Sequence, residues 1–589
     1  MKSGNVKSRM LLLGAFIVSS VILAFGFMTL PKPRPLDAEG FSSARVAEDI
    51  EVISREPHSV AHPVEREKVR EYIDGRLEDM GAEIHRYQFD SLPGPPVLGE
   101  YYFDAVNLVA DFAPLSPEND VTYLMFVAHY DSRHVNHMPD GPSVSFGAAD
   151  DGYGVGVILE TVSCLLEHRE QWKQGVRILF TDAEETKMTG MKMMWEHERH
   201  VFKDVGLIIN VEARGPWGPA LMFETSPGNE RIMDLYTSSA RYPYTYSLTN
   251  VVYDFLPNLT DFTIVKDEVP GLNFSTVADY NHYHTALDNF SNISERSIQH
   301  YGEQILPVAL NYLRNPEYAD KDYFKAERST VNFSIPVLGL FNVGKTAYAV
   351  MNILIFLLFV ILCTYEAKRG NLRILNVLKH SGLMLLAAVS VLVSGEMIGY
   401  LCATIAGDSF SLFGVVQGAF FDNKVMLVST IILTALTGLI YCFKRRNSQT
   451  RSYAYEWLFG ILVLESVLSI LLLVTVGENM MFLIPLFFAC MALLLCRITS
   501  WNAWIPLSIA GILLHACSFL YVLAMALTVG AFGIVAMLSL LDLLVIIPLS
   551  DIYIKENDQD GALRTHCAIQ PMCMPSRSVV PDLTDGKKH

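Results

Sequence analysis

Cysteine is scarce in the part of this chain where disulfide bonds would matter most. The chain has 589 residues and nine cysteines, but only Cys164 lies between residues 31 and 345. A disulfide bond within that segment is therefore excluded. Its stability must come from a hydrophobic core and, where the residues allow it, from bound metal.

Basic residues are also in short supply. The chain has 45 lysines and arginines against 62 aspartates and glutamates, a net charge of −17, which argues against a nucleic-acid partner. Hydrophobic residues make up 51% of the chain, too many for a purely soluble protein. They concentrate in the first 30 residues and beyond about residue 340, in runs long enough to cross a bilayer.

The first apolar run lacks the small-residue cleavage pattern of a signal peptide. Residues 10–30 follow three basic residues, exceed the usual length of a signal-peptide core and lead into the segment PKPRP. We therefore predict a short cytoplasmic N-terminus (1–9) followed by an uncleaved transmembrane anchor (10–30). A cleaved signal peptide is the alternative.

The loops between the later apolar runs differ sharply in charge. Two loops, 407–423 and 477–479, contain no lysine or arginine, whereas 366–373 and 444–451 are basic. Basic loops stay in the cytoplasm. With eight spans threaded in order, all basic segments fall on one side, which predicts an extracytoplasmic domain (31–345), a polytopic membrane domain of about seven helices (346–550) and a cytoplasmic tail (551–589). The predicted later spans are 347–365, 382–405, 425–443, 455–476, 480–496, 503–528 and 530–550.

The extracytoplasmic segment alternates strand and helix patterns. Strands are predicted at 106–109, 121–131, 176–182, 205–212 and 270–276, and helices at 64–81, 154–170, 187–201 and 293–313, the last with Ser294 as its N-cap. Such alternation favours an α/β fold with a mixed, largely parallel sheet sandwiched by helices. The C-terminal half is predicted to be an all-α membrane domain.

Polar residues lie at the carboxyl ends of three of these strands. His129 and Asp131 follow LMFVA, Glu184 and Glu185 follow RILFTDA, and Glu212 follows LIINV. Sheets of this kind bind ligands at the carboxyl ends of their strands. Each group alone has a simpler explanation as a surface residue, turn or helix cap, but their coincidence at one sheet edge indicates a site.

Five segments supply the candidate ligands. They are AHYDS (128–132), GAADDGYG (147–154), DAEE (182–185), NVEARG (210–215) and HYHTALDN (282–289). Imidazoles with carboxylates suit zinc, and so many carboxylates suit two ions that share a bridging one. Such a pair activates a water, and hydrolysis still needs a carboxylate that binds no metal to take the water's proton. One of the adjacent glutamates can bind metal while its neighbour acts as that base.

These five motifs, in this order and spacing, resemble the co-catalytic zinc exopeptidase family that includes leucine-type aminopeptidases, glutamate carboxypeptidase and glutaminyl cyclase. The layout of one anchor, an outer domain and a polytopic region is similar to the membrane-bound branch of the fungal vacuole and animal endoplasmic reticulum. The motif resemblance covers about residues 45–315, including REPHSVAHPVEREKVREYI (55–73).

The resemblance implies a role for each motif. Asp150, rather than Asp151, would bridge two zinc ions; the remaining ligands would be His129 and Glu212 at one ion and Glu185 and His284 at the other. Glu184 would be the general base, and Asp131 would hold the tautomer of His129. The sequence departs from the family pattern where glutamate replaces the commoner aspartate at Glu212 and where Tyr153 replaces serine.

The resemblance implies an aminopeptidase acting on peptides beside a lipid bilayer, and it leaves two alternatives: a catalytically silent binding ectodomain and a mono-zinc glutaminyl cyclase. His134, His137 and His282 are rival ligands, more typical of loop or pocket-wall residues. Four ionisable residues in or near the apolar spans either line a polar pathway or reach the membrane surface: Glu396, Glu465, His515 and Asp542. The oligomeric state is not indicated.

Overall fold

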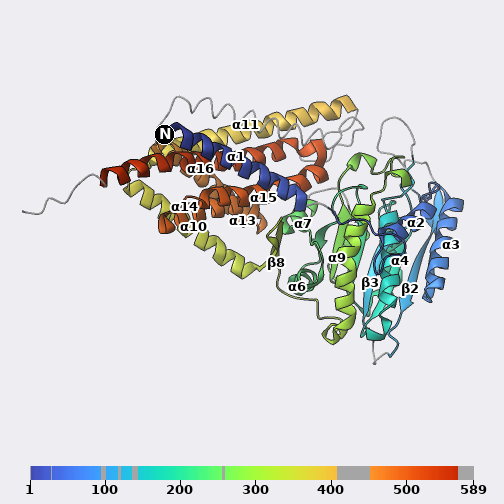
Figure 1. Cartoon of the computed structure of the whole chain (residues 1–589). Helices are drawn as coiled ribbons and strands as arrows, with labels where there is room; N and C mark the ends of the chain where they lie inside the picture. The colour runs from blue at the N-terminus through green and yellow to red at the C-terminus, as the bar shows by residue number, and fades with distance from the viewer. Residues whose placement is uncertain are drawn as a thin grey trace, which may run out of the picture.

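The structure is a computed structural model that describes residues 2–27, 30–94, 101–116, 121–134, 144–254, 259–406 and 451–567. An α/β domain lies at one end of the molecule and a bundle of long helices at the other (Figure 1). The N-terminal helix α1 (Lys2–Phe27) lies in the bundle, although more than 300 residues separate it from the other bundle helices.

The α/β domain is built on a seven-stranded mixed sheet. The strand order is β1-β2-β4-β3-β5-β7-β6, and the central four strands are parallel. The strands are β1 (Glu83–Pro93), β2 (Tyr102–Phe112), β3 (Tyr123–His129), β4 (Gly175–Thr181), β5 (Val205–Ala213), β6 (Leu221–Thr225) and β7 (Gly271–Thr276). The predicted fold class is confirmed: the outer pairings are antiparallel, and the buried centre is parallel.

Helices cover both faces of the sheet. On one face lie α2 (Ser43–Ile53), α4 (Gly152–Leu166) and α9 (Glu295–Arg314); on the other lie α5 (Thr189–His197) and α8 (Asp261–Val265). Side chains alternate between the two cores along a strand, as the pleat requires: Phe126 of β3 packs in the first core and Val127 in the second. The strands of the sheet's centre are therefore apolar on both faces.

The helix ends follow local signals in the sequence. Helix α3 (Pro63–Asp79) begins with a proline in its first turn and stops before Gly81, which has a positive φ. Ser294 caps α9 as predicted, because its side chain accepts a hydrogen bond from the Ser297 N–H.

Several elements carried no clear pattern and were not predicted. These are β1, β6, the helices α2, α6 (Glu230–Ser239), α7 (Ser247–Asp254) and α8, and a hairpin of β8 (Thr330–Ile335) and β9 (Gly339–Gly344). Most lie at an edge of the sheet or at the junction with the helical bundle, where packing partners come from distant parts of the chain.

Seven helices in the described part of the chain are long and apolar enough to cross a membrane. They are α1, α10 (Lys345–Lys368), α11 (Ile374–Ala406), α13 (Arg451–Val476), α14 (Met480–Thr499), α15 (Trp504–Leu527) and the first part of α16 (Phe532–Cys567). The eighth predicted span, 425–443, lies outside the described residues, so the count of eight stays a prediction.

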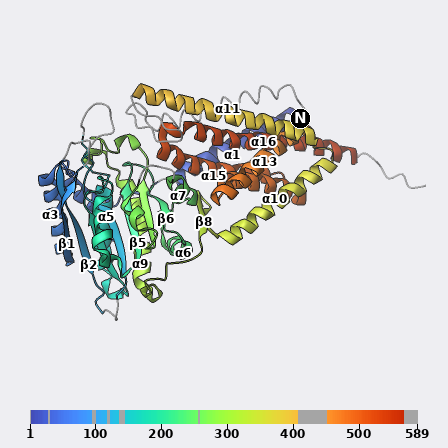
Figure 2. The same cartoon turned by 180° about the vertical axis from the view of Figure 1, so that it is seen from behind.

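The two halves of the molecule meet along one surface. One hydrophobic core contains both Tyr246 and Phe333 of the α/β half and Phe519 of α15. Seen from behind, β6, α7 and β8 lie at the side of the sheet that faces α15 (Figure 2). The junction therefore lies next to the sheet edge where β5 and β7 end.

Candidate metal centre

The candidate ligands come together at the carboxyl ends of the four parallel strands. His129 is the last residue of β3, Glu185 follows β4, Glu212 lies near the end of β5, and His284 follows β7. Asp150 lies just before α4, and the Asp150–Asp151 peptide bond is cis. Five segments far apart in the sequence thus meet because parallel strands end at the same edge.

Two groups of three side chains each have the geometry to hold a metal ion. One is His129, Asp150 and Glu212, and the other is Asp150, Glu185 and His284; all five side chains are buried, and Asp150 belongs to both groups. Its Oδ1 lies 3.2 Å from His129 Nε2 and its Oδ2 lies 3.2 Å from His284 Nε2. Asp151 belongs to neither group and instead caps α4 through Gly154 N–H.

The remaining contacts close each group. Glu212 Oε2 lies 3.7 Å from His129 Nε2, and Glu185 Oε1 lies 3.1 Å from His284 Nε2. The ring of Tyr283 stacks on that of His284, with centroids 3.6 Å apart. Arg133 Nη1 donates to Glu185 Oε2 at 2.9 Å and so holds the second carboxylate oxygen.

Asp131 contacts both His129 and Glu184, but with different atoms. Its backbone carbonyl lies 2.9 Å from His129 Nδ1, whereas its carboxylate Oδ1 is 3.5 Å from that nitrogen. The same Oδ1 accepts a hydrogen bond from the Glu184 N–H at 2.9 Å. The carbonyl is thus the nearer partner of the imidazole, and the carboxylate holds the backbone of Glu184.

The adjacent glutamates point to different places, which explains how both can be used. Ala183, just before them, has a φ of 57°, so the chain turns sharply after β4. Glu185 reaches His284, whereas Glu184 lies outside both groups and lines a pocket next to Asp150 and Glu212.

The electrostatics of this centre fit bound cations. Burial raises the pKa of the Glu212 carboxyl, an effect that His129 opposes and Asp150 reinforces. Burial also raises the pKa of the Glu184 carboxyl well above its usual value. Asp150 Oδ2 and Glu185 Oε1 are buried, and both lie close to His284 Nε2. Buried carboxylate oxygens of this kind are costly unless a cation or donor satisfies them.

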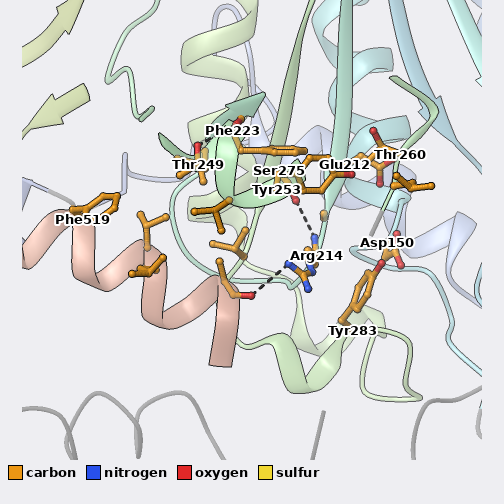
Figure 3. Close-up of a pocket in the computed structure, with 18 of the residues that line it drawn as sticks. Asp150, Glu212, Arg214, Phe223, Thr249, Tyr253, Thr260, Ser275, Tyr283 and Phe519 are labelled. Carbon is orange, nitrogen blue, oxygen red and sulfur yellow. Dashed lines mark hydrogen bonds between the residues drawn. The ribbon is translucent and has the colours of Figure 1, made fainter. Parts of the chain in front are cut away.

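A pocket opens from the centre toward the helical bundle (Figure 3). It encloses about 850 Å³ between protein atoms, including the part open to solvent. Asp150, Glu212 and Tyr283 lie at one end, Arg214 lies in the middle, and Phe519 of α15 lies at the other end. The pocket therefore connects the candidate metal centre with the membrane half of the chain.

The rival histidines lie outside both groups. The side chain of His134 is buried, and burial lowers its pKa to about 4. His282 Nδ1 contacts the Asp279 carbonyl at 3.1 Å. Neither belongs to a group that can hold a metal in the described residues, and His137 lies outside the described residues.

Several residues around the centre were not singled out from the sequence. Asp288 accepts from Ala149 N–H at 2.7 Å and so holds the segment that carries Asp150, while burial and Asp150 raise its pKa to about 7. Its place inside the motif HYHTALDN was the available signal. Arg133, Tyr283 and Arg214 lie within a few positions of candidate ligands in the sequence, which was the signal that could have found them. No such signal in the sequence pointed to α15.

The fold and the site together define a class: an α/β domain with a carboxylate-bridged pair of candidate metal positions at its parallel strand ends. Residues 107–309 match the model of Peptidase family M28. This part of the chain is a Peptidase family M28 domain, and membership in this zinc metallopeptidase family implies zinc.

Relatives of this chain include membrane metallopeptidases. It is 27% identical over 319 residues to the vacuolar membrane protease of Candida dubliniensis, covering 52% of this chain and 32% of that protein. It is 28% identical over 260 residues to endoplasmic reticulum metallopeptidase 1 of Homo sapiens, covering 42% of this chain and 27% of that protein. The chain thus spans about a third of these relatives' length or less.

Solved structures similar to this chain cover less than half of it. A glutaminyl cyclase from Porphyromonas gingivalis aligns with a TM-score of 0.38 and 16% identity over 46% of this chain and 99% of its own. A Zn-dependent exopeptidase from Parabacteroides distasonis aligns with a TM-score of 0.36 and 18% identity over 46% of this chain and 99% of its own.

Proposed function

We propose that this protein is a membrane-anchored zinc metallo-exopeptidase, an aminopeptidase that hydrolyses peptides with Glu184 as general base. The observation that carries the proposal is the pair of buried ligand groups that share Asp150, with an unshared carboxylate, Glu184, in the same pocket. An aminopeptidase needs both parts: metal positions and a proton acceptor beside them.

The residues that would hold zinc are the two groups described above. His129, Asp150 and Glu212 would hold one ion, and Asp150, Glu185 and His284 the other. When bound, zinc polarises a carbonyl group and lowers the pKa of water. Arg133 keeps Glu185 in place, and the Asp131 carbonyl fixes His129 with its Nε2 directed to Asp150.

Glu184 would move the proton. Its N–H donates a hydrogen bond to the Asp131 carboxylate, which holds the backbone of Glu184 beside the candidate ligands. It would take a proton from the attacking water and pass it to the leaving amine. Burial, reinforced by the neighbouring carboxylates, raises the pKa of the Glu184 carboxyl, which suits this role.

The aminopeptidase direction is supported by the charge at the polar end of the pocket. Glu184, which lines the pocket and belongs to neither metal group, would attract the free α-ammonium group of a peptide. A carboxypeptidase is the second candidate, because Arg214 also lines the pocket and a guanidinium suits a terminal carboxylate. N-acetylated and C-amidated forms of one tripeptide separate these candidates: acetylation blocks an aminopeptidase, and amidation blocks a carboxypeptidase.

We further propose that the M28 domain lies on the extracytoplasmic side of the bilayer. The helix ends that contact this domain are the ends predicted to lie on the side of the bilayer opposite the basic loops. The last turns of α15 line its pocket, and Glu478, between α13 and α14, accepts a hydrogen bond from Ser247 at 2.6 Å. Both contacts agree with the charge distribution of the loops.

The deciding experiment compares the wild-type chain with Glu184→Gln in detergent micelles. We expect about two zinc ions per chain in both proteins and hydrolysis of unblocked peptides by the wild type alone. The variant should lose about 10²–10⁴-fold in kcat. Glu196→Gln, at an exposed position on α5, is the matched control and should retain full activity.

Each other outcome contradicts a definite part of the proposal. Loss of zinc together with activity would make Glu184 a ligand. A wild-type chain that binds zinc but hydrolyses no peptide would be a silent binding ectodomain. One zinc per chain with cyclisation of N-terminal glutamine would identify a glutaminyl cyclase.

A further inference from the structure

The pocket that starts at the metal centre ends on a helix of the membrane half. Phe519, Val522, Leu523 and Ala526 of α15 line it, together with residues of β5, β6, α7 and β7. These four positions follow the spacing i, i+3, i+4 and i+7, so they form one face of the helix. Figure 3 shows this helix opposite Asp150 and Glu212, with Arg214 between them.

The α15 helix is fixed against the M28 domain by polar contacts as well as by packing. Tyr246 Oη and Ser518 Oγ are 2.5 Å apart, and Tyr244 Oη donates to the Ser518 carbonyl at 3.3 Å. Arg214 Nη1 donates to the Ala526 carbonyl at 3.4 Å. The helix thus belongs to the pocket wall and contacts Arg214, two residues after Glu212.

The chemistry of the pocket changes along its length. The end at the metal centre is lined by carboxylates. Leu221, Phe223 and Val277 also line the pocket and belong to the same hydrophobic core as the α15 residues, so the end at α15 is apolar. An apolar chamber that adjoins a hydrolytic centre binds the side chain next to the bond that is cleaved. Leu523 is 7% exposed and Val522 is 2% exposed, so a side chain filling the chamber would contact buried apolar surface.

We propose that α15 determines substrate specificity. Its last turns form the wall of a subsite that receives a large apolar side chain, such as leucine or phenylalanine, next to the scissile bond. The membrane half is then part of the substrate-binding site as well as an anchor. This inference rests on the proposed peptidase function and names the substrate class that it would select.

Two leucines one turn apart on α15 provide a matched pair for the test. Leu523 lines the pocket and Leu527 does not; both are buried, with exposed fractions of 7% and 4%. Leu523→Ala should lower the ratio of kcat/KM for leucyl over alanyl peptides by about tenfold. Leu527→Ala removes the same atoms at a similar cost in stability and should leave that ratio unchanged. Equal ratios in both variants and the wild type would overturn the proposal.

A substitution that reduces the volume of the pocket tests the same proposal from the other side. Val522→Phe should abolish hydrolysis of leucyl and phenylalanyl peptides but keep that of alanyl peptides, because only the apolar end of the pocket is filled. A uniform loss for all three peptides in a variant that retains its zinc would contradict a specificity role.

A measurement without turnover separates this inference from the proposed function. Val522→Cys is treated with a water-soluble thiol reagent, and modification at that residue is followed by mass spectrometry. A leucine-containing tripeptide should slow its modification more than an alanine-containing one, and Leu527→Cys should show no such difference. If the leucine peptide slows the modification but no peptide is hydrolysed, the subsite is supported and the peptidase function is contradicted. If peptides are hydrolysed but the modification is not slowed, the peptidase function is supported and the subsite is contradicted.

Discussion

At the residue scale, Asp131 divides two tasks between its backbone and its side chain. The carbonyl contacts His129, and the carboxylate accepts from the Glu184 N–H. A carboxylate two residues after a histidine is usually read as the partner of the imidazole. Here the Asp131 carboxylate lies closer to the Glu184 N–H, at 2.9 Å, than to His129 Nδ1, at 3.5 Å.

This division leads to a testable difference between kcat and zinc content. Asp131→Ala should lower kcat by about 10–100-fold, because the backbone of Glu184 loses its partner, while zinc content stays near that of the wild type. Asp131→Asn keeps an acceptor oxygen and should restore part of the activity. The measurements are steady-state kinetics and metal analysis. A drop in zinc content that parallels the loss of activity would indicate that Asp131 acts by holding His129 instead.

At the element scale, α9 is tied to the edge of the sheet through one histidine. His300 Nδ1 accepts from the Ala220 N–H at 2.9 Å, and Nε2 contacts the Tyr242 carbonyl at 2.9 Å. Only the neutral ring with its proton on Nε2 makes both bonds. Burial lowers the pKa of His300 to about 4, although the bond to Tyr242 raises it.

The lowered pKa gives a pH dependence of stability with a definite sign. The unfolded chain binds a proton at His300 below about pH 6.5, and the folded chain does so only near pH 4. The contribution of His300 to the free energy of unfolding is therefore fully present above pH 6.5. It falls by up to about 3 kcal/mol as the pH drops to 4. His300→Gln should be less stable at pH 7 but should lose less stability between pH 7 and pH 5. Thermal unfolding of the full chain in micelles measures this, and equal losses in both proteins would contradict it.

At the scale of the whole molecule, the two halves share one hydrophobic core. Residues of the α/β half, including Leu221, Phe223, Tyr246 and Phe333, pack with the membrane helices. An α/β domain without the helices would expose this surface to water, and apolar surface of that extent drives association.

We therefore expect residues 30–344 alone to bind zinc but to self-associate without detergent. Light scattering and metal analysis test both parts. The candidate zinc ligands all lie in the α/β half, so metal binding should persist, while the pocket should lose its α15 wall and with it the proposed preference for large apolar residues. A monomeric domain with unchanged selectivity would show that the junction contributes neither stability nor specificity.

The sequence alone determined the elements with strong local patterns. Parallel strands rich in apolar residues, the cap at Ser294 and the polar residues after each strand were readable because they depend on neighbours within a few positions. The convergence of the ligand motifs followed from them, since parallel strands end at one edge. The edge elements β1 and β6 were not readable, because their sequences are weakly patterned.

Only the tertiary structure decided which atoms meet. Asp150 reaches His129 with one carboxylate oxygen and His284 with the other, and Asp131 uses its carbonyl for His129. Phe519 of α15, more than 300 positions after Glu212 in the chain, lines the same pocket as Glu212. These outcomes depend on the packing of segments that are remote in the chain. No pattern along the sequence records such a contact, because the free energy that fixes it comes from surfaces that meet only after folding.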